Sequence, residues 1–264
     1  MYAFGYHRPT TIDEAVKLLG QSEDASAIAG GQTLLQSLKQ RLAQPADLID
    51  LGAIKELSGI TVDGKTVVIG ALTRHNEVAL SPEVQKAIPA LADLAGAIGD
   101  HQVRNVGTIG GSVANSDPAA DYPAAVLGLG ATIETNQRRI AADDFFIDLF
   151  ETALEPGELI KAIHFPGPKR AAYVKFPQPA SRYALVGVMV AETGDGVRVA
   201  VTGAGACAFR VPAMEQALAG DFSADAIKGV QVDADELNDD IHGTPAYRAH
   251  LVNVLARRAV EAAR

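Results

Sequence analysis

The sequence has 264 residues, of which 48% are hydrophobic and 21% are charged, a composition typical of a globular protein with a substantial core. Its formal net charge is −9, from 23 Lys and Arg against 32 Asp and Glu, and it contains no basic run. This excludes a nucleic-acid backbone or an anionic membrane surface as the main partner, because both require clustered Lys and Arg. We therefore expect a small molecule or another protein as the partner.

The cysteine count and the N-terminus exclude several further classes. Cys207 is the only cysteine, so this chain alone can form no intrachain disulfide, four-cysteine zinc site or cysteine-ligated iron–sulfur cluster. The first ten residues, MYAFGYHRPT, lack a signal-peptide pattern, and no apolar run approaches the length of a membrane span. We expect a cytoplasmic protein without a membrane span.

The first 72 residues are predicted to alternate helix and strand and then to form a hairpin. Thr11, followed three residues later by Glu14, is a capping-box pattern in front of an apolar helical face. Asp63-Gly64 separates two apolar segments and is typical of a hairpin turn. In chain order we expect helix 11–20, strand 27–29, helix 33–42, strand 47–51 and the hairpin strands 59–62 and 65–72.

The next stretch is predicted to be mostly helical and then irregular. Pro82 and Pro89 interrupt the helical pattern of residues 73–99. Residues 103–117 carry Gly107, Gly110 and Gly111 among Thr, Ser and Asn, so we expect a loop there rather than a regular helix. The remaining elements of this region are expected to be helix 123–128, strand 131–135, helix 143–150 and strand 159–165.

The pattern changes after residue 170, where strands dominate. The segments 173–176, 184–192 and 197–205 predict a three-stranded meander, followed by a long C-terminal helix over 245–263. We place a domain boundary in the Pro-Gly-Pro-Lys-Arg stretch at 166–170. The expected domains are 1–168, with subdomains of about 1–56 and 57–168, and 169–264.

Two double-glycine segments are the most informative candidates for a binding site. The first, AGGQT at 29–33, lies between a predicted strand and a predicted helix, where free N–H groups hold a phosphate without any Lys. The second, GTIGGS at 107–112, places hydroxyls on both sides of a glycine pair that lets a ligand approach the backbone closely. Either pair alone is what a tight turn requires, but the two together predict a pyrophosphate held from both sides.

Other candidates are weaker. The G-x-G-x-x-A pattern at 203–208 resembles a dinucleotide-binding turn, but Pro212 and the absence of a following strand argue against a Rossmann site. Asp117 and Asp121 suit helix capping, and Asp121 is also compatible with a ribose or flavin contact. His75 and His101 lack metal-ligand spacing and are expected to be ordinary surface or core histidines. No catalytic triad can be assembled, so we assign neither catalytic nor metal-binding residues.

At these residues the sequence closely resembles a known family. The matching segments are FGYHRPTTIDEAVKLL, IAGGQTLLQSLKQRLAQPADLIDL, VVIGALTRH, NVGTIGGSVANSDPAADYPAAVLGLGA and GELIKAIHFP, with weaker similarity at YVKF and VTGAGACAFR. They resemble the FAD-binding, medium subunit of the molybdenum hydroxylases, the group of aerobic carbon monoxide dehydrogenase and xanthine dehydrogenase. The similarity covers most of residues 4–166 in the family's order.

The resemblance implies an α+β fold. Two subdomains would form an FAD-binding fold of the vanillyl-alcohol-oxidase/p-cresol-methylhydroxylase type, followed by a small C-terminal domain with a three-stranded antiparallel sheet and helices. By motif position, the implied FAD-binding residues are Ala29, Gly30, Gly31, Gln32, Thr33, Leu34, Ile98, Thr108, Ile109, Gly110, Gly111, Ser112, Asp121, Ile160 and Lys175. Ile98 stands where xanthine dehydrogenases place an aromatic residue beside the flavin ring, and Tyr183 is a candidate to cover the ring instead.

The resemblance also implies a function and partners. In this family a small subunit with [2Fe–2S] clusters relays electrons from a large molybdopterin subunit, which oxidises the substrate, to the FAD of the medium subunit and then to an external acceptor. A dimer of heterotrimers is the implied assembly. Two alternatives remain: a self-contained flavoprotein oxidase of the same fold, for which the residues after 170 are few, and a binding or scaffold protein that has lost the flavin.

Overall fold

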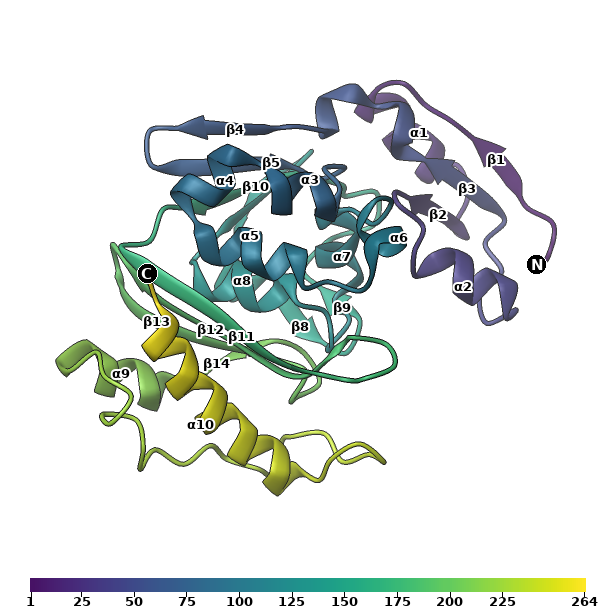
Figure 1. Ribbon diagram of the computed structural model, residues 1–264. Coiled ribbons are helices and arrows are strands. Elements are labelled where there is room, and N and C mark those ends of the chain that lie inside the picture. Colours follow the sequence, from purple (N-terminus) through teal and green to yellow (C-terminus); the bar gives the residue numbers. More distant parts are fainter.

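The structure is a computed structural model that describes residues 1–264, and it contains three main sheets (Figure 1). The N-terminal unit, which we define as residues 5–57, holds a small parallel sheet of order β1-β3-β2. Its elements are β1 (Gly5–His7), α1 (Ile12–Leu19), β2 (Ala25–Ile28), α2 (Leu34–Lys39) and β3 (Asp47–Asp50). The alternation of helix and strand predicted for this part is confirmed.

The middle of the chain forms a five-stranded antiparallel sheet of order β4-β5-β10-β6-β7. Its strands are β4 (Ile60–Asp63), β5 (Thr66–Gly70), β6 (Thr132–Thr135), β7 (Arg139–Ala141) and β10 (Ile160–Pro166). Its helices are α3 (His75–Leu80), α4 (Pro82–Ala87), α5 (Pro89–Gly96), α6 (His101–Arg104), α7 (Ile109–Asn115) and α8 (Tyr122–Gly128). The β4–β5 hairpin is confirmed, and Gly64 adopts the positive φ of 59° that its turn requires.

Two predictions in this region are wrong. Residues 103–117 are not a continuous loop: they contain α7, because the Thr108 side chain caps the helix by accepting from the Gly111 N–H at 3.2 Å. Residues 143–150 are not a helix but a short turn followed by β8 (Phe146–Asp148), which pairs with β9 (Glu151–Thr152). Phe145 is fully buried in the main hydrophobic core, and this packing holds the segment extended.

The C-terminal part forms a four-stranded antiparallel sheet, one strand more than predicted. Its elements are β11 (Arg170–Pro177), β12 (Ala184–Thr193), β13 (Gly196–Thr202), β14 (Phe209–Arg210), α9 (Pro212–Gly220) and α10 (Pro245–Ala262). The fourth strand has only two residues, which is too short for a periodicity to show in the sequence. The predicted C-terminal helix is confirmed as α10.

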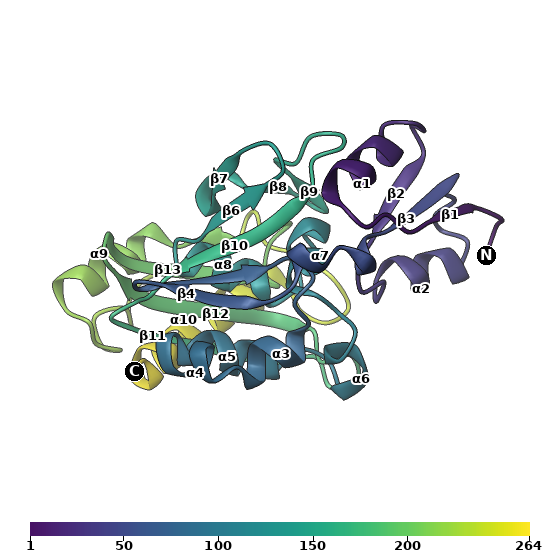
Figure 2. The same cartoon turned by 90° about the horizontal axis from the view of Figure 1, so that it is seen from above.

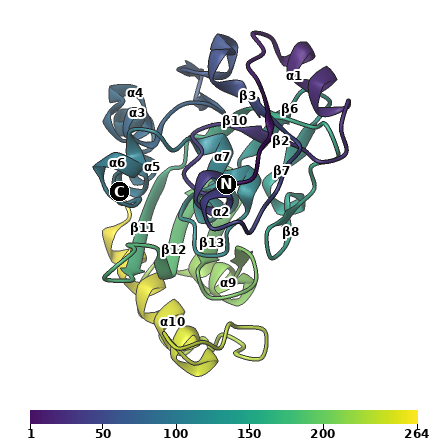
Figure 3. The ribbon, with the colours of Figure 1, turned by 90° about the vertical axis from the view of Figure 1, so that its right-hand side faces the viewer.

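Alternate residues of the C-terminal sheet pack into two different cores. Met189 and Ala191 belong to the main core under α5 and α8, whereas Val188 and Val190 belong to a second core covered by α9 and α10. This follows from the two-residue period of a strand. Figure 1 and Figure 3 show α10 on the outer side of this sheet and the N-terminal unit farther away. A domain boundary near residue 168 stays a prediction, since the sheet after it shares a core with the helices before it.

No helix of the structure has both the length and the apolarity needed to cross a membrane.

Candidate functional site

A cavity of about 680 Å³ is lined both by the N-terminal unit and by the rest of the chain. Figure 2 shows the N-terminal unit at one side of the molecule. The walls of the cavity come from the segments after β2, after β5 and before α7, from the start of β10, and from the connection between β11 and β12. The predicted site residues that line it are Ala29, Gly30, Gly31, Gln32, Thr33, Leu34, Ile98, Thr108, Gly110, Gly111, Ser112, Asp121 and Ile160. Tyr183 lines it too, whereas Ile109 and Lys175 do not.

The first glycine loop offers a row of free donors. No carbonyl or side chain of the protein accepts a hydrogen bond from the N–H groups of residues 30–34. Gly31 has a φ of 69°, a conformation that favours glycine, and its neighbour Gly30 presses against the second loop. A Cβ on Gly30 would stand 2.2 Å from the Val106 carbonyl oxygen, so only glycine fits there. Consecutive unpaired N–H groups at a cavity form a cradle for an anionic group such as a phosphate.

The second loop works differently from the first. The N–H groups of Ile109 and Gly110 donate to the carbonyls of Thr73 and Ala71 at 3.0 and 2.8 Å, and that of Ser112 donates to the Thr108 carbonyl at 3.1 Å. The Gly111 N–H donates to the Thr108 hydroxyl, so within residues 107–112 only the Thr108 N–H has no acceptor in the protein. The loop instead presents the hydroxyls of Thr108 and Ser112 to the cavity. The first loop therefore offers a row of backbone donors, and the second offers one backbone donor together with two hydroxyls.

The two glycines of the second loop have separate roles. A Cβ on Gly110 would stand 2.5 Å from the Ala71 Cβ, so Gly110 permits close packing of α7 on the end of β5. A Cβ on Gly111 would meet only the Thr108 hydroxyl at 2.9 Å and the Ala29 Cβ at 3.7 Å. Gly111 thus keeps open the space between the two loops. Ile109 is fully buried in the core and anchors the helix rather than facing the cavity.

Asp121 reaches the cavity from a buried ion pair. It is 4% exposed, and its carboxylate accepts from the Tyr173 hydroxyl at 2.6 Å and from the Lys175 ammonium at 2.9 Å. Burial raises the pKa of Asp121, and the positive charge of Lys175 and the hydrogen bond from Tyr173 oppose that rise. Lys175 also donates to the carbonyls of Ala97 and Arg182, so its three protons are used within the protein. Lys175 therefore supports Asp121 rather than projecting into the cavity.

His75 is a cavity residue that sequence reasoning treated as an ordinary histidine. Its side chain is buried and lines the cavity, and burial together with the positive charge of Arg104 lowers the pKa of His75 to about 4. The imidazole is thus neutral at pH 7. Its Nδ1 atom has no hydrogen-bond partner, and its ring lies 5.3 Å from that of Tyr122. Nothing in its sequence surroundings distinguishes it from a core histidine.

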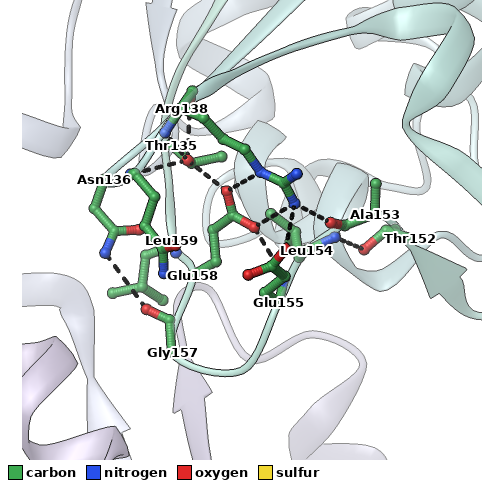
Figure 4. A network of polar contacts seen from close by, with 11 residues as sticks. Thr135, Asn136, Arg138, Thr152, Ala153, Leu154, Glu155, Gly157, Glu158 and Leu159 are labelled. Carbon is green, nitrogen blue, oxygen red and sulfur yellow. Dashed lines mark hydrogen bonds and ion pairs between the residues drawn. The ribbon is translucent and has the colours of Figure 1, made fainter.

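A second group that sequence reasoning missed is the ion pair of Arg138 and Glu158 (Figure 4). The Glu158 carboxylate accepts from Arg138 at 3.0 Å through both Nε and Nη2, and from the Thr135 hydroxyl at 2.7 Å. Arg138 also donates to the Ala153 carbonyl at 2.7 Å. The hydrogen bond from Arg138 outweighs desolvation and lowers the pKa of Glu158 to about 2. No sequence motif indicates this pair, because Glu158 lies twenty residues after Arg138.

This pair and its neighbour Asn136 hold one wall of the cavity. The Glu158 carboxylate accepts from the Glu155 N–H at 2.9 Å, and the Asn136 side-chain oxygen accepts from the Leu159 N–H at 2.7 Å. Figure 4 shows these contacts around the loop that leads into β10. Leu154, Glu158, Leu159 and Ile160 all line the cavity, so the network determines where Ile160 stands.

Comparison with known proteins shows the family of this chain. Residues 2–168 match the family model described as "FAD binding domain in molybdopterin dehydrogenase". The chain belongs to this family. The predicted family, the α+β fold class and FAD as the cofactor of this chain are thereby confirmed, and the protein is part of an oxidoreductase.

Relatives match the chain over nearly its whole length. The carbon monoxide dehydrogenase medium chain of Hydrogenophaga pseudoflava is 37% identical, covering 98% of this chain and 96% of the relative. The nicotine 6-hydroxylase medium subunit of Paenarthrobacter nicotinovorans is 36% identical, with coverage of 98% and 96%. Among solved structures, carbon monoxide dehydrogenase from Hydrogenophaga pseudoflava has a TM-score of 0.90 at 37% identity, covering 99% of this chain and 97% of that chain. Quinoline 2-oxidoreductase from Pseudomonas putida 86 has a TM-score of 0.89 at 29% identity, covering 99% and 96%.

The cavity fits FAD on its own features. The free N–H groups of residues 30–34 suit the pyrophosphate, and the hydroxyls of Thr108 and Ser112 add donors beside them. The cavity volume of about 680 Å³ is that of a cofactor site rather than of a packing defect. The assignment of individual residues to parts of FAD stays a prediction.

Proposed function

We propose that this chain is the FAD-carrying medium subunit of a molybdenum-dependent hydroxylase or dehydrogenase. It holds FAD between a small subunit with [2Fe–2S] clusters and an external electron acceptor, while a large molybdopterin subunit oxidises the substrate. FAD supplies the ability to exchange electrons both singly with clusters and in pairs with organic acceptors. The chain's own contribution is to bind, orient and shield that group.

The observation that carries this proposal is the row of unpaired N–H groups at residues 30–34, facing a cavity in a chain of this family. The medium chains and subunits among its relatives support the same placement within a complex. The chain's single cysteine cannot ligate an iron–sulfur cluster alone, so the clusters belong to a partner in this proposal. A dimer of such heterotrimers is the expected assembly.

The alternative is a self-contained flavoprotein oxidase. It requires an acid or base group at the cavity that could act on an organic substrate. Asp121 and Glu158 are engaged in ion pairs, and His75, with a pKa of about 4, is a weak base. Asp117 and Tyr183 also line the cavity, and burial raises the pKa of both. We favour the medium subunit because the chain matches medium subunits over nearly its whole length.

The test is to purify the protein from its native cells through a tag on this chain alone, and to measure what co-elutes. We expect stoichiometric FAD on this chain, with iron and molybdenum in the same peak on other chains. The isolated chain should keep FAD and show no substrate-dependent bleaching of the flavin absorbance. Substrate-dependent bleaching by the pure chain would support the oxidase instead, and a colourless chain that takes up no FAD would support the scaffold protein.

A further inference from the structure

A second cavity, of about 580 Å³, adjoins the FAD cavity. Gly99 and Arg182 line both cavities, so the two share a wall. The second cavity lies beside the end of α5, the end of α6 and the connection between β11 and β12. Three of the lining residues are cationic: Arg104, Lys175 and Arg182.

The charges of this cavity do not balance within the chain. The lining carboxylate, Asp93, pairs with Arg264 at 2.9 Å, and Lys175 pairs with Asp121. Arg104 and Arg182 have no carboxylate within ion-pair distance, although Arg104 is only 9% exposed. Burying an arginine costs solvation free energy, and a nearby anion compensates for this cost.

The two unpaired arginines converge on one atom. Nη1 of Arg104 donates to the Gly99 carbonyl oxygen at 3.0 Å, and Nη1 of Arg182 donates to the same oxygen at 3.2 Å. Arg104 also donates to the Ile98 carbonyl at 2.8 Å, and its Nη2 lies 3.3 Å from Nδ1 of His101. Two guanidinium groups held around one neutral oxygen repel each other, and an anion placed between them relieves that repulsion.

The backbone holds Arg182 in this position. Arg182 has a φ of 62°, a left-handed conformation that is unfavourable for a residue other than glycine. Its N–H donates to the Gln178 carbonyl at 2.8 Å, the Gln178 N–H donates back to the Tyr183 carbonyl at 2.8 Å, and Lys175 donates to the Arg182 carbonyl at 2.9 Å. The loop is thus closed on itself in the conformation that aims Arg182 at Gly99, as a preorganised anion site requires.

We propose that the second cavity binds a phosphate-bearing small molecule through Arg104 and Arg182. Paired guanidinium groups match the several oxygens and the multiple negative charge of a diphosphate group through bidentate hydrogen bonds. Because Gly99 and Arg182 also line the FAD cavity, occupancy of the second cavity perturbs the environment of the flavin. This coupling rests on the proposed function, whereas the anion site itself rests on the second cavity alone.

The test uses inorganic pyrophosphate as the probe on the full chain saturated with FAD. Isothermal titration would compare the unmodified chain with Arg182→Gln, Arg104→Gln and the control Arg139→Gln. Arg139 is exposed and paired with Glu134 at 3.1 Å, so it matches the change of charge without touching either cavity. We expect about tenfold or greater weakening in both test variants, none in the control, and a shift of the flavin absorbance in the unmodified chain.

The outcomes separate this inference from the proposed function. Absence of pyrophosphate binding, equal affinity in all four chains, or binding only with release of FAD would overturn the second site while leaving the bound flavin in place. A chain that holds no FAD would overturn the proposed function, and the same variants would still decide the anion site. If Arg104→Gln fails to fold, the exposed Arg182→Gln decides alone.

Discussion

Replacing Gly111 with valine tests whether the gap between the two glycine loops is where FAD binds. The new Cβ would stand 2.9 Å from the Thr108 hydroxyl and 3.7 Å from the Ala29 Cβ, and the two methyl groups would extend into the cavity. The backbone tolerates the change, because Gly111 lies in helix α7 and does not have a positive φ. Displacing the Thr108 cap should lower the free energy of unfolding by about 1 kcal/mol. The higher helix propensity of valine offsets a few tenths of a kcal/mol of this loss.

The effect on FAD should be much larger than the effect on folding. A valine that keeps the phosphates from two of the free N–H groups removes two charge-assisted hydrogen bonds, each contributing about 1.5–3 kcal/mol. The sum of about 3–6 kcal/mol corresponds to a loss of roughly 10² to 10⁴ in affinity. The measurement is flavin occupancy by absorbance and FAD affinity by titration, with circular dichroism to check folding.

Gly220→Val is the matched control, since Gly220 ends helix α9 with no atoms within 4 Å of its Cβ position. It should fold and bind FAD like the unmodified chain. If folded Gly111→Val binds FAD as tightly as that control, the second loop is only a turn, and the placement of the pyrophosphate between the loops is wrong.

Three further predictions concern the walls of the cavity and the cofactor. Arg138→Met should lower the free energy of unfolding in urea by about 3 kcal/mol, because it leaves the buried Glu158 carboxylate without a counter-charge. The control Arg139→Met should have little effect, because Arg139 is exposed. Equal losses in the two variants would contradict a role specific to the pair of Arg138 and Glu158. The pKa of Glu158 is lowered from 4.5 to about 2, so its contribution to stability is complete above pH 4.5 and is lost as the pH falls toward 2. In Glu158→Gln the free energy of unfolding should therefore change less with pH between pH 4.5 and pH 2. The same pH dependence in the variant and the unmodified chain would refute the lowered pKa of Glu158. Finally, FAD should be bound non-covalently, so acid precipitation should leave a colourless pellet, and a pellet that retains stoichiometric flavin would show a covalent link.

The buried pair of Asp121 and Lys175 gives a prediction about packing rather than about ligand contact. Lys175→Met should lower the free energy of unfolding by about 3–5 kcal/mol. The Asp121 carboxylate keeps its hydrogen bond from the Tyr173 hydroxyl but loses its counter-charge. The double variant Lys175→Met with Asp121→Leu should recover part of this loss in urea unfolding. A double variant that loses the sum of the two single losses would show that the residues act independently.

Local pattern and spacing were sufficient for much of this protein. The helix of α1, the β4–β5 hairpin, the long strands β12 and β13 and the helix α10 were all predictable, because each satisfies its own hydrophobic period and its own caps or turn. The glycine pairs at residues 30–31 and 110–111 also singled out two segments that line one cavity in the structure, since glycine is required where backbone must approach closely. These signals are contained in stretches of a few residues.

What only the tertiary structure decided depends on contacts between distant segments. Helix α7 forms despite its glycines because the carbonyls of Thr73 and Ala71 accept from its first two N–H groups, and these contacts leave only the Thr108 N–H of that turn free. Lys175 is held by Asp121, 54 residues away, instead of reaching into the cavity. Arg104 and Arg182 meet at the Gly99 carbonyl although 78 residues separate them (182 − 104). Such pairings leave no local signature, because they are selected by the free energy of burying partners together rather than by the conformational preference of either segment.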